Sequence, residues 1–334
     1  MQVRFRKREI RLQVLLNYAF ICFLCLVNLG ITFMNIIEQI YPLAIHVPVQ
    51  KEVGCNGHVE LCDRKYSNIT QIATHDSAFV GVLPMDNQNV HITKQLDAGI
   101  RFLQAQAHLD RQNRLSLCHT DCGMKDAGSV QYYLETIKSW LDTHPKEVVT
   151  VLLTNPNYAN ITHFAHAFNA SGITQYTYTP LPTHNSADPS TWPTLGELIV
   201  NNTRLIAFID SGADDALVPY ILSEFTYFWE TPFDTTDPSF PQCAVDRPED
   251  IAKHPARINE RMYIVNHFLD THLLGMDVPN RRDAGRTNKA EGEGSIGKQV
   301  ELCVGVHGRK PKGVLVDYFD RGEVFRVQDL LNGF

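Results

Sequence analysis

The sequence predicts an α/β fold, an irregular (β/α)8 TIM-type barrel preceded by one N-terminal transmembrane helix. The 334 residues are 44% apolar and 20% charged, which is typical of globular proteins and excludes collagen-like, coiled-coil and wholly disordered chains. Strand-like segments alternate with helical ones along most of the chain, which favours a barrel of parallel strands. A doubly wound sheet is the alternative that shows the same alternation.

The N-terminal region carries a membrane signal. Residues 1–11 contain five Arg or Lys side chains, and residues 12–37 contain no charged side chain. A helix over the second segment is about 39 Å long, and a bilayer core needs about 20 apolar residues. We expect a cytosolic basic tail at 1–11, a signal anchor at 12–37, a stalk at 38–53 and the barrel at 54–334.

This organisation makes the chain a single-pass type II membrane protein with its body in the secretory lumen or outside the cell. A long cleaved signal peptide is the alternative, and the body is then secreted. The formal charge is +3 over residues 1–50, within a total of -7, so the remainder carries -10. An acidic body argues against nucleic acid as a partner.

The predicted strands are short runs rich in apolar residues. Val148–Leu153 shows no apolar–polar alternation, which indicates a strand buried on both faces, as in a parallel sheet. In chain order the strands are Ile69–Thr74, Ile100–Ala107, Leu115–Cys118, Val148–Leu153, Leu205–Ile209, Phe225–Trp229, Met262–Asn266 and Val314–Phe319.

The predicted helices lie between these strands. Apolar residues recur at helical spacing between Tyr132 and Thr143, and Pro145 ends that helix. Gly99 ends a helix whose last residues are Gln95–Ala98. The other helices are Ile161–Phe168, Thr194–Val200, Ser295–Val304 and Val324–Leu331.

The segment from Gly275 to Gly294 is predicted to be a loop that contains Arg281 and Arg282. It follows a strand, so in a barrel it lies on the catalytic face. It is either a solvated loop or a lid whose arginines contact a substrate head group. We group both arginines with the candidate substrate-binding residues.

Six cysteines lie in the body, and six cysteines allow 15 pairings. Closeness along the chain favours Cys55–Cys62 and Cys118–Cys122, which leaves Cys243–Cys303. A zinc site at Cys118, His119 and Cys122 is the alternative, but a fourth ligand at motif spacing is missing. We therefore expect neither a metal nor a cofactor.

Four N-glycosylation sequons are present, at Asn68, Asn160, Asn169 and Asn201. Asn68 and Asn201 each precede a predicted strand. The N-terminal ends of barrel strands lie opposite the catalytic face, so glycans at these two positions would leave that face open.

Candidate catalytic residues follow the C-terminal ends of predicted strands. His75 and Asp76 follow the first strand, His119 follows the third, and Asp317 lies in the last. Two histidines with two carboxylates suit general acid–base chemistry, in which each carboxylate orients one imidazole. Ser77 lacks the G-x-S-x-G context of a nucleophilic serine.

These motifs resemble the catalytic X-domain of phosphatidylinositol-specific phospholipase C, and especially the fungal phospholipase-C-like phosphodiesterases. The resemblance covers about residues 54–330. It rests on Cys55–Gly57, Leu61–Arg64, Tyr66–Asn68, Thr74–Gly81, Gln95–Gln106 and Leu117–Thr120.

The resemblance implies an irregular barrel that cleaves a phosphodiester in a phosphoinositide or a glycosylphosphatidylinositol-type lipid, a role in lipid metabolism. In the metal-independent bacterial members one histidine deprotonates the inositol 2-hydroxyl and another protonates the leaving oxygen. Carried over, His75 is the base supported by Asp317, and His119 is the acid supported by Asp76.

One departure from the family bears on activity. The bacterial members have Asp-x-Arg on the second strand, where the arginine neutralises the phosphate, but this chain has Gln104 and Gln106. Arg101 points to the other face of the strand. We assign Gln104, Gln106 and Glu230 to substrate binding. An active phosphodiesterase and a catalytically weak barrel that binds a head group or glycan are therefore both open.

Overall fold

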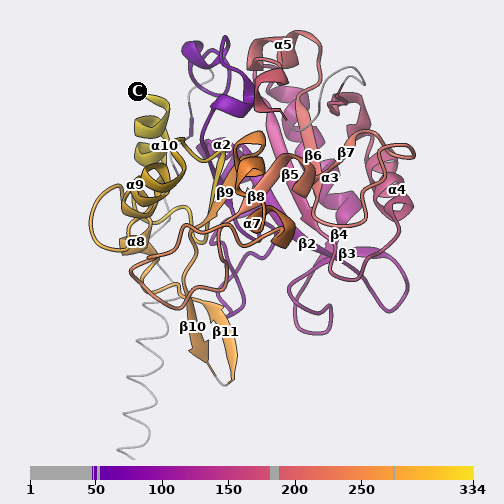
Figure 1. The fold of residues 1–334 in the computed structure, drawn as a ribbon. Helices are drawn as coiled ribbons and strands as arrows, with labels where there is room; N and C mark the ends of the chain where they lie inside the picture. Colours follow the sequence, from indigo (N-terminus) through magenta and orange to yellow (C-terminus); the bar gives the residue numbers. More distant parts are fainter. Residues whose placement is uncertain (1–46, 48, 51–52, 181–187, 274) are drawn as a thin grey trace, which may run out of the picture. The chain divides into compact units, whose positions relative to one another are not determined.

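In the computed structural model, eight parallel strands form the main sheet in the order β7-β6-β5-β2-β1-β12-β9-β8 (Figure 1). The structure describes residues 47, 49–50, 53–180, 188–273 and 275–334. The bounds are β1 (Gln71–Thr74), β2 (Phe102–Leu109), β5 (Val149–Thr154), β6 (Leu205–Ile209), β7 (Ile221–Ser223), β8 (Phe228–Glu230), β9 (Met262–Asn266) and β12 (Gly313–Val316).

The sheet curls into a barrel that stays open between β7 and β8. These two strands end the strand order, and no pairing joins them within the described ranges. The ring of Phe228 in β8 lies 5.0 Å from that of Phe208 in β6 and 6.4 Å from that of Phe102 in β2, measured between centroids. Since neither strand is a neighbour of β8, these contacts cross the interior. The barrel prediction holds in this irregular form, and the doubly wound alternative does not.

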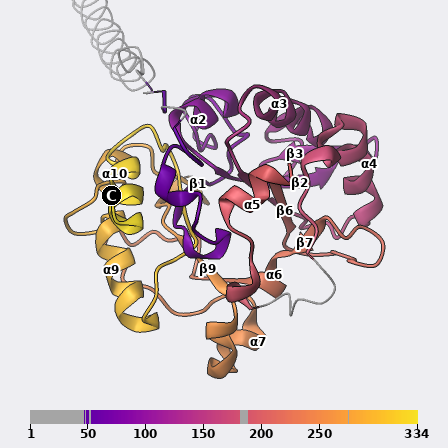
Figure 2. The same ribbon diagram turned by 90° about the horizontal axis from the view of Figure 1, so that it is seen from above.

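Helices surround the strands (Figure 2). Gly99 ends the first of them in a left-handed conformation with φ of 119°, as predicted. The helices are α2 (Ile92–Ala98), α3 (Val130–Thr143), α4 (Ile161–Ser171), α5 (Leu195–Val200), α6 (Glu224–Tyr227), α7 (Glu249–Ala252), α8 (Ala284–Thr287), α9 (Ile296–His307) and α10 (Val324–Asn332).

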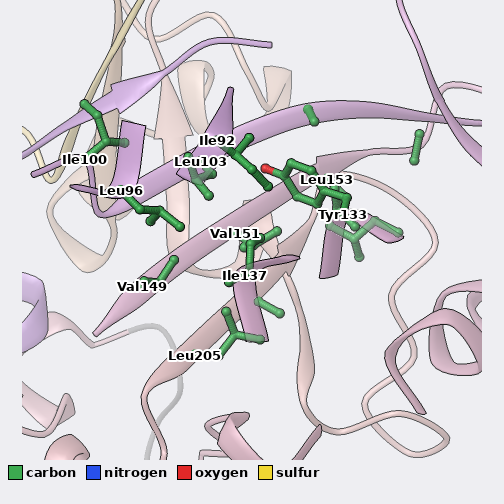
Figure 3. Close-up of a cluster of buried hydrophobic side chains, with 14 of the residues drawn as sticks. Ile92, Leu96, Ile100, Leu103, Tyr133, Ile137, Val149, Val151, Leu153 and Leu205 are labelled. Atoms are coloured by element: carbon green, nitrogen blue, oxygen red, sulfur yellow. The ribbon is translucent and has the colours of Figure 1, made fainter. Parts of the chain in front are cut away.

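Two hydrophobic clusters fill the two sides of the sheet. Val149, Val151 and Leu153 of β5 pack outward with residues of α2 and α3 (Figure 3). Leu152 of the same strand belongs to the inner cluster. Because side chains alternate along a strand, Gln104 and Gln106 of β2 share the inner face with Phe102.

Three predicted elements differ from the structure. Leu115–Cys118 is β3, but it pairs antiparallel with β2 and is not a barrel strand; it pairs in turn with β4 (Asp126–Ser129). In the predicted strand Phe225–Trp229 the first part belongs to α6, and the strand begins at Phe228. The predicted loop from Gly275 contains α8 and one strand of the hairpin β10 (Asp270–Leu273)–β11 (Met276–Pro279).

The N-terminal predictions concern residues that lie mostly outside the described ranges. Residues 1–37, the predicted tail and signal anchor, lie outside the described residues. Within the part of the chain that is described, no helix is long and apolar enough to span a bilayer.

The three predicted disulfides are confirmed: they join Cys55 to Cys62, Cys118 to Cys122, and Cys243 to Cys303.

Candidate active site

A cavity of about 380 Å³ lies at the C-terminal ends of the parallel strands. Its wall includes residues from β2, β5, β8, β9 and the hairpin β10–β11, which projects from the lower end of the barrel in Figure 1. Six of the predicted site residues line it: His75, Asp76, Gln104, Gln106, His119 and Glu230.

The turn after β1 places His75 and Asp76. The backbone N–H of His75 continues the sheet by donating to the carbonyl of Val316 at 3.0 Å. Asp76 then takes a left-handed conformation with φ of 45°. Its N–H donates to Gln104 Oε1 at 2.7 Å, so this glutamine secures an unfavourable backbone conformation. Gln104 therefore supports the turn as well as lining the cavity.

His75 is held on three sides. Its Nδ1 lies 2.9 Å from Asp317 Oδ1, which also accepts a hydrogen bond of 3.0 Å from Asn87 Nδ2. The ring stacks on Phe268 with centroids 3.7 Å apart. Burial lowers the pKa of His75, but the carboxylates of Asp76 and Asp317 outweigh burial and raise it to about 9. The contact with Asp317 leaves Nε2 directed away from that carboxylate.

His119 reaches the cavity from the hairpin β2–β3. It follows β3 directly, beside the Cys118–Cys122 disulfide. Its Nε2 lies 3.5 Å from Asp76 Oδ2, and His75 Nε2 lies 3.6 Å from the same oxygen. One carboxylate oxygen thus stands between the two imidazoles. The sequence predicted this convergence, but from a third barrel strand rather than an antiparallel hairpin.

Gln106 connects the two histidine-bearing segments. Its Nε2 donates to Asp76 Oδ2 at 2.8 Å, and its Oε1 accepts from the N–H of Thr120 at 3.0 Å. Both polar atoms of the side chain are therefore engaged with the protein. The structure places Gln106 where it orients Asp76 and the loop after His119.

Arg247 supplies a positive charge that the sequence analysis did not identify. Among the described residues that line the cavity, it is the sole Arg or Lys. It forms an ion pair with Glu230, which also accepts a hydrogen bond of 3.2 Å from Asn266 Nδ2. The guanidinium of Arg247 lies 4.5 Å from the ring centre of Phe233. Arg247 lies between β8 and β9 outside any strand end or motif, so no sequence signal distinguished it.

Carboxylates dominate the rest of the cavity. Asp76, Asp210, Glu230, Asp234, Asp270 and Asp277 line it. Glu224 is buried beside Glu230 outside the described wall, and burial together with Glu230 raises the pKa of Glu224 well above its usual range. Asp270 begins the hairpin β10–β11; burial and then Asp317 raise the pKa of Asp270 to about 7. Arg247 overcomes burial and lowers the pKa of Glu230. The cavity is therefore acidic, with its fixed cation at Arg247.

The structure does not bring Arg281 and Arg282 into the cavity wall. Arg281 donates to the carbonyl of Gly81 and lies 4.7 Å from the ring centre of Tyr318, and Arg282 is exposed. Ser77 is buried, with its hydroxyl 2.7 Å from that of Tyr133. Arg281, Arg282 and Ser77 therefore all lie outside the described cavity wall.

The structure also bears on the zinc alternative and on the glycosylation sequons. Cys118 and Cys122 form a disulfide, so they are not thiolate ligands of zinc. In the described part of the chain, no group of three or more His, Cys, Asp or Glu side chains is arranged to hold a metal ion. The four acceptor asparagines are all exposed: Asn68, Asn160, Asn169 and Asn201.

Comparisons with known proteins give the family. The family model described as PI-PLC X 1 matches residues 61–332. "PI-PLC X domain-containing protein 1" of Arthroderma benhamiae is 48% identical over 86% of this chain and 92% of its own length. An "Uncharacterized secreted protein" of the same fungus is 39% identical over 83% of this chain and 64% of its own length.

Solved structures agree on the fold. The phosphatidylinositol-specific phospholipase C of Listeria monocytogenes matches with a TM-score of 0.54 at 17% identity, over 82% of this chain and 95% of that one. A Staphylococcus aureus phosphatidylinositol-specific phospholipase C variant matches with a TM-score of 0.53 at 13% identity, over 81% and 94%. The barrel fold is the one found in these phosphatidylinositol-specific phospholipases. The chain belongs to the PI-PLC X domain family.

Proposed function

We propose that the chain is an acid–base phosphodiesterase that cleaves a phosphoinositide or a glycosylphosphatidylinositol-type lipid. One observation carries the proposal: the Nε2 atoms of His75 and His119 lie 3.6 and 3.5 Å from the same Asp76 oxygen. This spacing suits one imidazole that removes a proton and another that delivers one to the same phosphate. No protein nucleophile is required.

In this reaction a hydroxyl next to the phosphate acts as the nucleophile. His75 Nε2, neutral and oriented by Asp317 at Nδ1, takes the hydroxyl proton while the oxygen attacks phosphorus. The bond between phosphorus and the lipid oxygen breaks, and His119 Nε2 gives its proton to that oxygen. The products are a cyclic phosphodiester and a free alcohol such as diacylglycerol.

The charge on the phosphate also needs a partner. Preorganised positive groups that meet developing charge supply much of the catalysis in phosphoryl transfer. Gln106 brings no charge, and both its polar atoms are engaged. Arg247 lines the same cavity, so we assign it to the phosphate, with Glu230 and Asn266 fixing its position.

A second function remains open because Arg247 is already paired with Glu230. If this ion pair persists when substrate is bound, the phosphate meets a neutral site. The barrel would then recognise an inositol or glycan head group with little turnover. Glu230, Gln104 and Gln106 would serve as hydrogen-bonding groups in that case.

Location is part of the proposal. We place the body on the lumenal or outer side of a membrane, held by a signal anchor at 12–37 or released if that segment is cleaved. Three disulfides favour an oxidising compartment, and one relative is called secreted.

The test supplies the full chain with phosphatidylinositol in mixed micelles and follows cyclic inositol phosphate by phosphorus NMR. His75→Ala and His119→Ala should each lower turnover by about 10²–10⁴-fold. His166→Ala, at an exposed position of α4, is the matched control and should leave turnover unchanged. If the unaltered chain is inert while inositol phosphate raises its melting temperature, the binding function replaces the enzymatic one.

A further inference from the structure

A second cavity, of about 600 Å³, lies at the opposite end of the barrel. Arg64 and Lys65 enter it from the segment before β1, and Arg309 and Lys310 from the segment between α9 and β12. Its other lining residues are uncharged, so no carboxylate faces the four cations from the described wall. This is unusual for a body whose formal charge is strongly negative.

The four cations contact backbone carbonyls rather than acids. Arg64 Nη1 donates to the carbonyl of Asn332 at 2.6 Å, and Lys310 Nζ to that of Leu331. Both carbonyls lie at the C-terminal end of α10, whose dipole offsets about half a charge. Lys65 donates to the carbonyl of Ser190. None of the four forms an ion pair with a carboxylate in the described ranges, although Lys65 lies close enough to Asp188 and Glu197 to interact with their charges.

Arg309 has a buried donor without an acceptor. Its Nη2 donates to the carbonyl of Ile258 at 2.7 Å, and its guanidinium lies 5.3 Å from the ring centre of Tyr263. Its Nε is buried and has no hydrogen-bond partner among the described residues. The guanidinium is therefore held against Ile258 and Tyr263, which do not line the cavity, and Arg309 contributes its positive charge rather than this donor.

From this geometry we propose that the cavity formed by Arg64, Lys65, Arg309 and Lys310 binds a small, multiply charged phosphate-bearing anion, separately from the active-site cavity. Guanidinium groups bind phosphate oxygens through paired hydrogen bonds, and ammonium groups add point charges. Four cations on one wall favour a ligand with at least two negative charges. That chemistry exists in soluble phosphate esters and in phosphorylated lipid head groups.

Calorimetric titration of the full chain tests the proposal with two probes. One is pyrophosphate, and the other is phosphatidylcholine vesicles that contain 10% phosphatidylinositol 4-phosphate. The test variant is Lys65→Gln combined with Lys310→Gln, both exposed. The control combines Lys94→Gln with Lys253→Gln, which are exposed lysines paired with Asp97 and Glu249.

The unaltered chain and the control should bind a probe, and the test variant should bind it at least about tenfold more weakly. Binding should also weaken at high salt. Binding of pyrophosphate identifies a soluble ligand, and binding of vesicles alone identifies a lipid head group. Arg247→Gln should bind as the unaltered chain does, which separates this site from the active site. Failure of both probes to bind, or equal binding by the test and control variants, would overturn the proposal.

Discussion

At the C-terminal ends of the barrel strands, carboxylates such as Asp76, Glu230 and Asp270 line a cavity whose described wall contains one arginine, Arg247. At the N-terminal ends, the other cavity has four cations and no described carboxylate in its wall. The same parallel strands support both ends, but the two cavity walls are lined by different residues.

This difference affects the chemistry at each end. The carboxylates around His75 raise its pKa to about 9. An anionic substrate in this cavity depends on Arg247 and the imidazoles for positive charge. The described wall of the basic cavity contains four cations and no acid, so a phosphate there meets positive charge directly. Under the two proposals, a phosphate therefore binds with little competition at one end, and binds against negative charge at the end where it is proposed to react.

The largest expected effect comes from removing the cation of the acidic end. Arg247→Gln should lower turnover of phosphatidylinositol by about 10²–10³-fold, because the phosphate loses its fixed positive partner. Arg281→Gln, which changes an arginine outside the cavity wall, is the control and should retain full turnover. Steady-state kinetics on both variants, with circular dichroism to verify folding, make the measurement. Full turnover by a folded Arg247→Gln protein would remove Arg247 from the mechanism.

The next effect is on pH dependence. His75 must be unprotonated to act as the base, and its raised pKa means that it is mostly protonated at pH 7. We expect kcat/KM to rise about tenfold per pH unit toward a pKa near 9, for as long as His119 keeps the proton that it must donate. Asp317→Asn removes one of the carboxylates that stabilise the imidazolium, so this limb should move to lower pH. A limb that stays in place in Asp317→Asn would show that another group titrates.

A smaller effect concerns the support of His119. Replacing Cys118 and Cys122 together by Ala should lower turnover about tenfold, because the loop that carries His119 loses its restraint. The Cys243–Cys303 bridge spans 60 residues rather than 4. Its removal should lower the melting temperature more, with little loss of turnover in the folded protein. The reverse pattern would contradict a positioning role for Cys118–Cys122.

The smallest effect is expected at the end opposite the active site. Asn68→Gln and Asn201→Gln remove acceptor sites that precede β1 and β6, far along the strands from His75. Turnover should stay within about twofold of that of the unaltered chain. A larger change would show that the two ends are not independent.

Much of the site could be predicted from sequence, because local patterns carry that information. Apolar runs indicated buried parallel strands such as Val148–Leu153, and polar residues after such runs indicated His75 and Asp76. Asp317 was identified inside the last predicted strand, which in the structure ends at Val316. The spacing of cysteines gave the three disulfides. Apart from Cys243–Cys303, which was the pair left over, each of these signals depends on residues within a few positions of one another.

Tertiary structure alone decided the placement of distant segments. Arg247 enters the active-site cavity from a loop with no motif, and Gln106 engages Asp76 and Thr120 rather than presenting free polar atoms. Arg64 and Arg309 meet in one cavity although they lie far apart in the chain. Contacts between segments that are distant in the sequence depend on how the sheet curls and how loops pack across it. The sequence by itself determined which residues end the strands, whereas packing determined which charges those residues face.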